Sequence, residues 1–209
     1  RLAERGVQIT DITHMLITHS HADHIGGLEQ AMLMGRYVAR RKLHCIISEE
    51  YQTVLWEQSL RGGAAHNERH EGKELVFEDF FEPIRPQRLA DDFRHMEETW
   101  IGSLNIKTFR TAHFPEQSLG WEDSFYSIGL LLDNKVLFTG DTNHDCQFFT
   151  GGIHASLDQI AELPPEIKRM TYLMHYADSW KNQEEKASEL GFAGFAREDI
   201  YYEWISGAE

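Results

Sequence analysis

Six consecutive residues near the start of the chain combine side chains that bind transition metals. The run from His19 to His24 contains three histidines and one aspartate. Zinc takes imidazole nitrogen and carboxylate oxygen readily, and a catalytic zinc keeps one coordination position open for water. A polar loop with incidental histidines would desolvate several titratable groups without any gain in packing. The run therefore predicts a metal centre with hydrolytic chemistry.

The four ligand-type side chains of this run divide into two pairs. The run directly follows a predicted strand, and alternate side chains on such a segment point to the same side. We therefore expect His19 and His21 to share one metal ion. Asp23 and His24 are then expected to reach a second ion close by.

Three further ligand-type residues each follow a predicted strand. They are His113, Asp141 and His175. Taken singly, each has an ordinary interpretation as a capped or hydrogen-bonded residue at a strand end. Together with the first run they form a set of five histidines and two aspartates, which fills two metal spheres with one shared carboxylate.

The elements that must position these residues follow from hydrophobic pattern and turn signals. Strands are expected at residues 14–18, 43–47, 96–100, 104–111, 124–132, 135–139 and 170–174. Helices are expected at residues 28–41, 49–60, 153–163 and 182–190, with a loop at 61–72. Strands alternate with helices, then form hairpins, then alternate again. This order predicts an α/β layered fold with mixed sheets.

Composition limits the class of protein. The 209 residues suffice for one domain, 1–209, and no apolar stretch is long enough for a membrane helix. Two cysteines, Cys45 and Cys146, suit a reducing cytoplasm and are expected to be small buried side chains. The net charge of −14 disfavours a stable nucleic-acid complex, whereas bound metal ions would make a site attractive to a small anionic substrate.

The metal-ligand motifs resemble those of the metallo-β-lactamase superfamily. The resemblance rests on residues 18–27, 111–113, 139–142 and His175. It implies an αβ/βα sandwich with two zinc ions, or manganese or another divalent metal in their place. The implied ligands are His19, His21 and His113 on one ion, Asp23, His24 and His175 on the other, and Asp141 between them. Members of this superfamily carry several strands ahead of the first histidine motif. Only 18 residues precede His19, so the N-terminal strands are expected to be missing from this chain.

Other segments are similar to the anti-Pycsar cyclic-nucleotide phosphodiesterases. They are residues 55–63, 77–84 and 125–130. The resemblance implies hydrolysis of 3′,5′-cyclic nucleotides, including cyclic CMP and cyclic UMP, to 5′-monophosphates, which counteracts cyclic-nucleotide antiviral signalling. It also implies a homodimer in the cytoplasm, or in the host cytoplasm for a phage protein, in which residues 56–65 approach the partner's site. Asp23 and Asp141 are the expected catalytic carboxylates, and Phe114, Trp121 or Tyr176 is expected to stack on the base.

Two alternatives remain at this stage. Histidine rather than glutamate at position 21 argues against the di-iron redox branch, but the ribonuclease Z group shares the metal set. That group uses a further histidine in a His-Glu-Ala-Thr segment, which this chain lacks, although His144 or His154 is a candidate substitute. The other alternative is a non-catalytic protein that sequesters a cyclic nucleotide, which the open coordination position disfavours.

Overall fold

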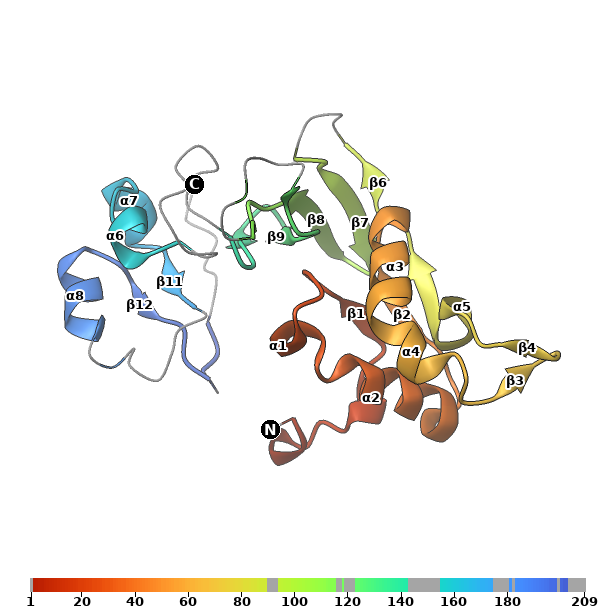
Figure 1. The fold of residues 1–209 in the computed structure, drawn as a ribbon. Helices are drawn as coiled ribbons and strands as arrows, with labels where there is room; N and C mark the ends of the chain where they lie inside the picture. Colours follow the sequence, from red (N-terminus) through yellow and green to blue (C-terminus); the bar gives the residue numbers. More distant parts are fainter. Residues whose placement is uncertain are drawn as a thin grey trace. The chain divides into compact units, whose positions relative to one another are not determined.

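The computed structural model describes residues 2–89, 94–115, 118, 123–142, 155–174, 181, 183–198 and 200–202. Contacts group the chain into two units that interleave along the sequence. Unit 1 comprises Arg1–Arg110 and Tyr126–Gly140, and unit 2 comprises Thr111–Phe125 and Asp141–Glu209. Helices and strands occur in both units, so the chain is mixed α/β (Figure 1). The single hydrolase domain and the metallo-β-lactamase sandwich stay predictions.

A three-stranded parallel sheet in unit 1 carries the first ligand run. Its strands are β1 (His14–Leu16), β2 (Leu43–Ile46) and β5 (Phe81–Ile84), in the order β1-β2-β5. Helix α2 (Leu28–Met34) and helix α3 (Glu49–Leu55) pack with this sheet around one buried apolar cluster (Figure 1). Each helix runs on into a π-helical turn, η3 (Gly35–Ala39) and η4 (Trp56–Leu60) respectively. The parallel strands thus all end at the edge where the ligand run begins.

Helix α3 begins and packs as its sequence dictates. Ser48 caps the helix, because its hydroxyl accepts a hydrogen bond of 3.2 Å from the backbone amide of Tyr51. Glu49 and Glu50 occupy the first turn, where negative charge is favourable. Tyr51 and Leu55 lie one helical turn apart and are both buried. The helix therefore presents one apolar face to the cluster of unit 1.

A five-stranded antiparallel sheet forms the other sheet of unit 1. Its order is β10-β9-β8-β7-β6. The strands are β6 (Gln87–Arg88), β7 (Glu97–Ile101), β8 (Leu104–Arg110), β9 (Ile128–Leu132) and β10 (Val136–Phe138). Asp133 and Asn134 join β9 to β10 with φ values of 50° and 53°. Two consecutive residues in the left-handed region form the tight turn that suits a hairpin, so the predicted turn is confirmed.

The remaining elements of unit 1 are short. They are η1 (Ala3–Arg5), η2 (Ile9–Asp11), α1 (Ala22–Ile25), α4 (Arg61–Ala64), β3 (Arg69–His70), β4 (Lys73–Glu74) and α5 (Phe77–Phe80). The predicted loop at 61–72 is therefore wrong in part, because it contains α4 and β3. Gly63 of α4 lies beside the exposed side chain of Glu29 on α2. A Cβ atom added to Gly63 would lie 2.0 Å from the Glu29 carboxylate.

Unit 2 has its own small apolar cluster. Leu173, Ala187, Phe192 and Phe195 are buried together. The elements around them are α6 (Leu157–Ile160), α7 (Pro165–Lys168), β11 (Tyr172–Leu173), α8 (Glu184–Glu189) and β12 (Gly194–Phe195). Strands β11 and β12 pair in parallel. Among the described residues, no helix of either unit is long and apolar enough to cross a membrane.

We expect the apolar cluster of unit 1 to dominate its stability. Leu55 is fully buried, and truncating such a side chain to alanine removes apolar burial and leaves a cavity. Leu55→Ala should lower the free energy of unfolding by about 2–5 kcal/mol in urea denaturation. Leu137 is 61% exposed, so Leu137→Ala should change the free energy of unfolding by less than about 0.5 kcal/mol. Equal losses in the two variants would contradict this assignment of the core.

An ionised carboxylate anchors the start of α5. Asp79 is buried, which opposes its ionisation, but its carboxylate accepts a hydrogen bond of 2.8 Å from the Val76 amide. His70 Nδ1 lies 2.8 Å from the same carboxylate and the Arg36 guanidinium lies 3.9 Å away. Together these groups outweigh burial and hold the pKa of Asp79 below its ordinary value.

The stability contributed by Asp79 should therefore depend on pH. A lowered pKa in the folded state contributes stability above the unfolded pKa of about 3.9, which is lost as pH falls through the folded pKa. Asp79→Asn should cost about 1–3 kcal/mol at pH 7 in urea denaturation, and the difference from wild type should shrink below pH 4. The matched control is Glu78→Gln, an exposed carboxylate on the same helix. A difference that is the same at pH 7 and pH 3 would contradict the role of the ionised form.

Candidate metal centre

The loop between β1 and α1, together with α1 itself, carries the predicted ligand run. β1 ends at Leu16 and α1 begins at Ala22, so the loop lies where the parallel sheet ends. His19 is buried, whereas His21 and His24 are half-buried. Asp23 projects from α1 with its side chain 60% exposed. Unit 1 thus gathers one buried and two accessible imidazoles with a carboxylate that solvent can reach.

His19 and His21 are spaced as two ligands of one metal ion. His19 Nε2 lies 3.2 Å from His21 Nδ1. Tetrahedral zinc with Zn–N bonds of about 2.0–2.1 Å holds two ligand nitrogens roughly 3.3 Å apart. The ring planes are inclined by 79°. The donor set and its spacing therefore fit zinc.

Asp23 and His24 form a second pair with similar spacing. Asp23 Oδ2 lies 3.4 Å from His24 Nε2. The ring centroid of His24 lies 4.0 Å from that of His19, so the two pairs are adjacent. The two pairs thus lie next to each other, the first on the loop and the second on α1, which is an arrangement that two neighbouring metal positions would need.

Thr18 orients two of these imidazoles. Its hydroxyl lies 3.2 Å from His19 Nδ1 and 3.4 Å from His24 Nδ1. A hydrogen bond at one ring nitrogen fixes the ring and leaves the other nitrogen for a metal. The Thr18 carbonyl accepts a hydrogen bond of 3.0 Å from the amide of Ile128, the first residue of β9. Thr18 therefore ties the ligand loop to the five-stranded sheet.

Unit 2 brings the segments around His113 and Asp141 together. Thr111 donates a hydrogen bond of 3.2 Å from its hydroxyl to the Asp141 carbonyl, and the Ala112 amide donates one of 3.2 Å to the Thr142 hydroxyl. The His113 carbonyl accepts a hydrogen bond from the Phe125 amide at 2.9 Å. His113 and Asp141 are both buried. Unit 2 thus carries an imidazole and a carboxylate on neighbouring backbone segments.

Several predicted residues lie outside the described part of the chain. They are His175, His144, His154, Trp121, Tyr176 and Cys146. Cys45 is buried, as expected, and burial raises the pKa of its thiol to about 12. Phe114 is also buried, which fits core packing rather than the predicted stacking on a base.

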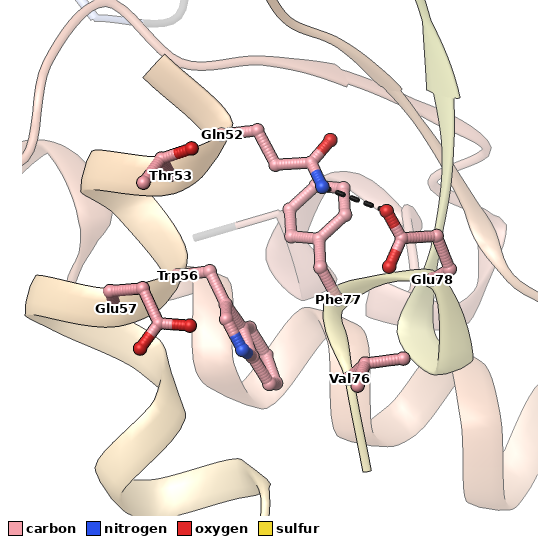
Figure 2. A pocket seen from close by; sticks show the side chains of 7 residues that line it. All are labelled: Gln52, Thr53, Trp56, Glu57, Val76, Phe77 and Glu78. Carbon is pink, nitrogen blue, oxygen red and sulfur yellow. Dashed lines mark hydrogen bonds between the residues drawn. The ribbon is translucent and has the colours of Figure 1, made fainter. Parts of the chain in front are cut away.

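The predicted dimer loop at 56–65 has a different structure. The turn η4 and helix α4 form most of it, and Trp56 is buried against Phe77 and Phe80. A shallow pocket lies beside these residues, between α3 and the start of α5 (Figure 2). Gln52 donates a hydrogen bond of 2.7 Å to Glu78 beside it, and no predicted metal ligand lines it.

No sequence motif indicated the hydroxyl contacts behind the ligand loop. Ser20, between His19 and His21, has its hydroxyl 3.0 Å from that of Tyr51 on α3. The Tyr51 ring stacks on Tyr126, with centroids 4.6 Å apart and planes inclined by 6°. Tyr51 and Tyr126 are far apart in sequence, so only a pattern of paired substitutions among relatives would have indicated this contact.

Comparison with known proteins gives a consistent assignment. The family model of "Anti-Pycsar protein Apyc1" matches residues 1–143 and 142–202. A protein of that name from Bacillus phage BSP38 is 33% identical over 205 residues, which cover 92% of this chain and 79% of the relative. A protein of the same name from Bacillus phage vB_BsuM-Goe3 is 32% identical over a match that covers 95% of this chain and 82% of the relative. A third, from Paenibacillus harenae, is 32% identical over a match that covers 85% of this chain and 74% of the relative. These matches run through residues 19–24 and both units, and this chain therefore belongs to the anti-Pycsar protein Apyc1 family.

Proposed function

We propose that this chain is a zinc-dependent phosphodiesterase that hydrolyses 3′,5′-cyclic nucleotides to 5′-monophosphates. The observation that carries the proposal is the 3.2 Å spacing of His19 Nε2 and His21 Nδ1, beside the pair formed by Asp23 and His24. The relatives are named as anti-Pycsar proteins, which supports an anti-Pycsar function for this chain. Cyclic CMP and cyclic UMP are the proposed substrates because the sequence resembles phosphodiesterases that cleave them.

The proposed ligand set is the one that the resemblance implies. His19, His21 and His113 would hold one zinc ion, Asp23, His24 and His175 would hold the second, and Asp141 would be the shared ligand. The homodimer implied by the resemblance, in which residues 56–65 approach the partner's site, remains part of the proposal.

Chain connectivity supports the assignment of Asp141. A Cβ atom added to Gly140 would lie 2.7 Å from the Ile128 carbonyl oxygen and 3.8 Å from Thr18 Cβ. Gly140 has a φ of 61°, so glycine is the residue that fits this close approach without strain. Asp141 follows directly, and consecutive Cα atoms are about 3.8 Å apart. Gly140 therefore lies close to Thr18, the residue before His19, and Asp141 is joined to Gly140 by the next peptide bond.

The proposed chemistry is an in-line displacement at phosphorus. Bound zinc ions would activate a water molecule and stabilise the charge that develops on the phosphoryl oxygens. Asp23, whose carboxylate is exposed, is the group proposed to orient the attacking water or accept its proton. Oxygen from water bonds to phosphorus, the bond from phosphorus to the 3′ oxygen breaks, and that oxygen takes up a proton.

The first prediction from this proposal concerns substrate and metal. Purified protein with zinc should convert cyclic CMP and cyclic UMP to 5′-monophosphates, as read by chromatography. Removal of metal by a chelator should abolish turnover, and added zinc should restore it. Trimming of precursor tRNA with the cyclic nucleotides untouched would instead support a ribonuclease Z-like endonuclease. Recovery of intact cyclic nucleotide bound to the metal-loaded protein would support sequestration.

The second prediction concerns the proposed shared ligand. Asp141→Ala should lower the zinc content below two ions per chain and reduce kcat/KM by about 100-fold or more. Zinc content is measured by elemental analysis of the purified variant. Asp158→Ala is the matched control, because this exposed aspartate of unit 2 pairs with Lys186 and belongs to no ligand set. Full zinc content and activity in Asp141→Ala would remove Asp141 from the centre.

A further inference from the structure

We propose that Tyr51 is a positioning residue for the metal-binding loop and acts through the hydroxyl of Ser20. This inference rests on the proposed function, because it assigns a role toward the zinc ion held by His19 and His21. Ser20 is the residue between those two ligands, so the position of its side chain fixes the backbone from which both imidazoles project. The Tyr51 hydroxyl, 3.0 Å away, is its described hydrogen-bond partner.

Tyr51 is held more firmly than a surface tyrosine would be. Its side chain is 2% exposed, and it lies in the first turn of α3, whose capping residue Ser48 binds its amide. Its ring stacks on Tyr126 almost in parallel. A buried ring in a fixed orientation places its hydroxyl with little loss of entropy when the contact to Ser20 forms.

A second layer fixes Tyr126 in turn. The Tyr126 hydroxyl lies 2.7 Å from that of Ser48, and the Arg110 guanidinium lies 4.4 Å from the centroid of its ring. Arg110 Nη1 is 3.7 Å from the carboxylate of Glu50. The support for the ligand loop therefore runs from the sheet residue Arg110 through Tyr126 to Tyr51 and then to Ser20.

Thr18 and Ser20 hold the loop through contacts to different partners. Thr18 contacts the imidazoles of His19 and His24 directly, whereas Ser20 contacts neither in the described structure and reaches toward α3 instead. Phenylalanine at position 51 would keep the buried ring and remove only the hydroxyl that contacts Ser20. Tyr51→Phe therefore tests the positioning role separately from core packing.

The test uses Tyr51→Phe, Ser20→Ala and the double variant in the full chain. Zinc affinity is measured by competition with a chromophoric chelator, and unfolding of the metal-free protein by urea. We expect each single variant to weaken zinc binding by about 10-fold, in the range seen when the partners of metal ligands are removed. The double variant should be no weaker than either single one, because both changes break the same contact.

Tyr37→Phe is the matched control, because Tyr37 lies on η3 in the same unit, in a segment that precedes β2. It should leave zinc affinity unchanged. The visible spectrum of the cobalt-substituted protein gives a second readout, and it should change in Tyr51→Phe but not in Tyr37→Phe. A purely structural role would lower the stability of the metal-free protein and leave affinity and spectrum as in wild type.

The outcomes separate the two proposals. If wild-type protein binds zinc and hydrolyses cyclic nucleotides while Tyr51→Phe binds zinc as tightly, the positioning role is overturned and the proposed function stands. Additive losses in the double variant would also overturn it. If the wild-type protein binds no zinc, both the proposed function and this inference are overturned.

Discussion

The hydrogen bond from the Ile128 amide to the Thr18 carbonyl joins the two sheets of unit 1 where the ligand loop begins. Thr18 follows β1 of the parallel sheet, and Ile128 opens β9 of the antiparallel sheet. Gly140 approaches both residues closely, so three distant parts of the sequence meet at this point. The placement of the imidazoles depends on this junction, because the loop has no long helix or strand of its own to hold it.

Hydroxyl groups hold the loop on two sides. Thr18 contacts imidazole nitrogens, and Ser20 contacts Tyr51 on α3. Such contacts cost little to form when both partners lie on rigid elements, and they restrict the rings to few orientations. In the proposed metal centre, imidazoles restricted to few orientations would bind a metal ion with less reorganisation than imidazoles on a mobile loop. The same restriction favours one geometry, and therefore one class of metal, over others.

Much of unit 1 was predictable from sequence because local pattern and turn residues agreed. The hairpin at Asp133 and Asn134 and the strands β7 and β8 formed as expected. The predicted loop at 61–72 was wrong in part because its polar, glycine-containing composition was interpreted as a loop, whereas residues 61–64 form helix α4 directly after η4. The proximity of His19 to His21 and of Asp23 to His24 followed from their closeness in sequence. The contact between Ser20 and Tyr51 did not, because it is created by tertiary packing between residues far apart in sequence.

The two neighbouring histidines of the first pair face each other through different nitrogens. His19 uses Nε2, the far atom of its ring, and His21 uses Nδ1, the near one. Glutamine places its terminal amide at about the reach of Nε2, and asparagine at about the reach of Nδ1. The two positions are thus inequivalent in length although the same amino acid occupies both. An exchange of ligands at this loop would have to respect that difference, with longer side chains at 19 and shorter ones at 21.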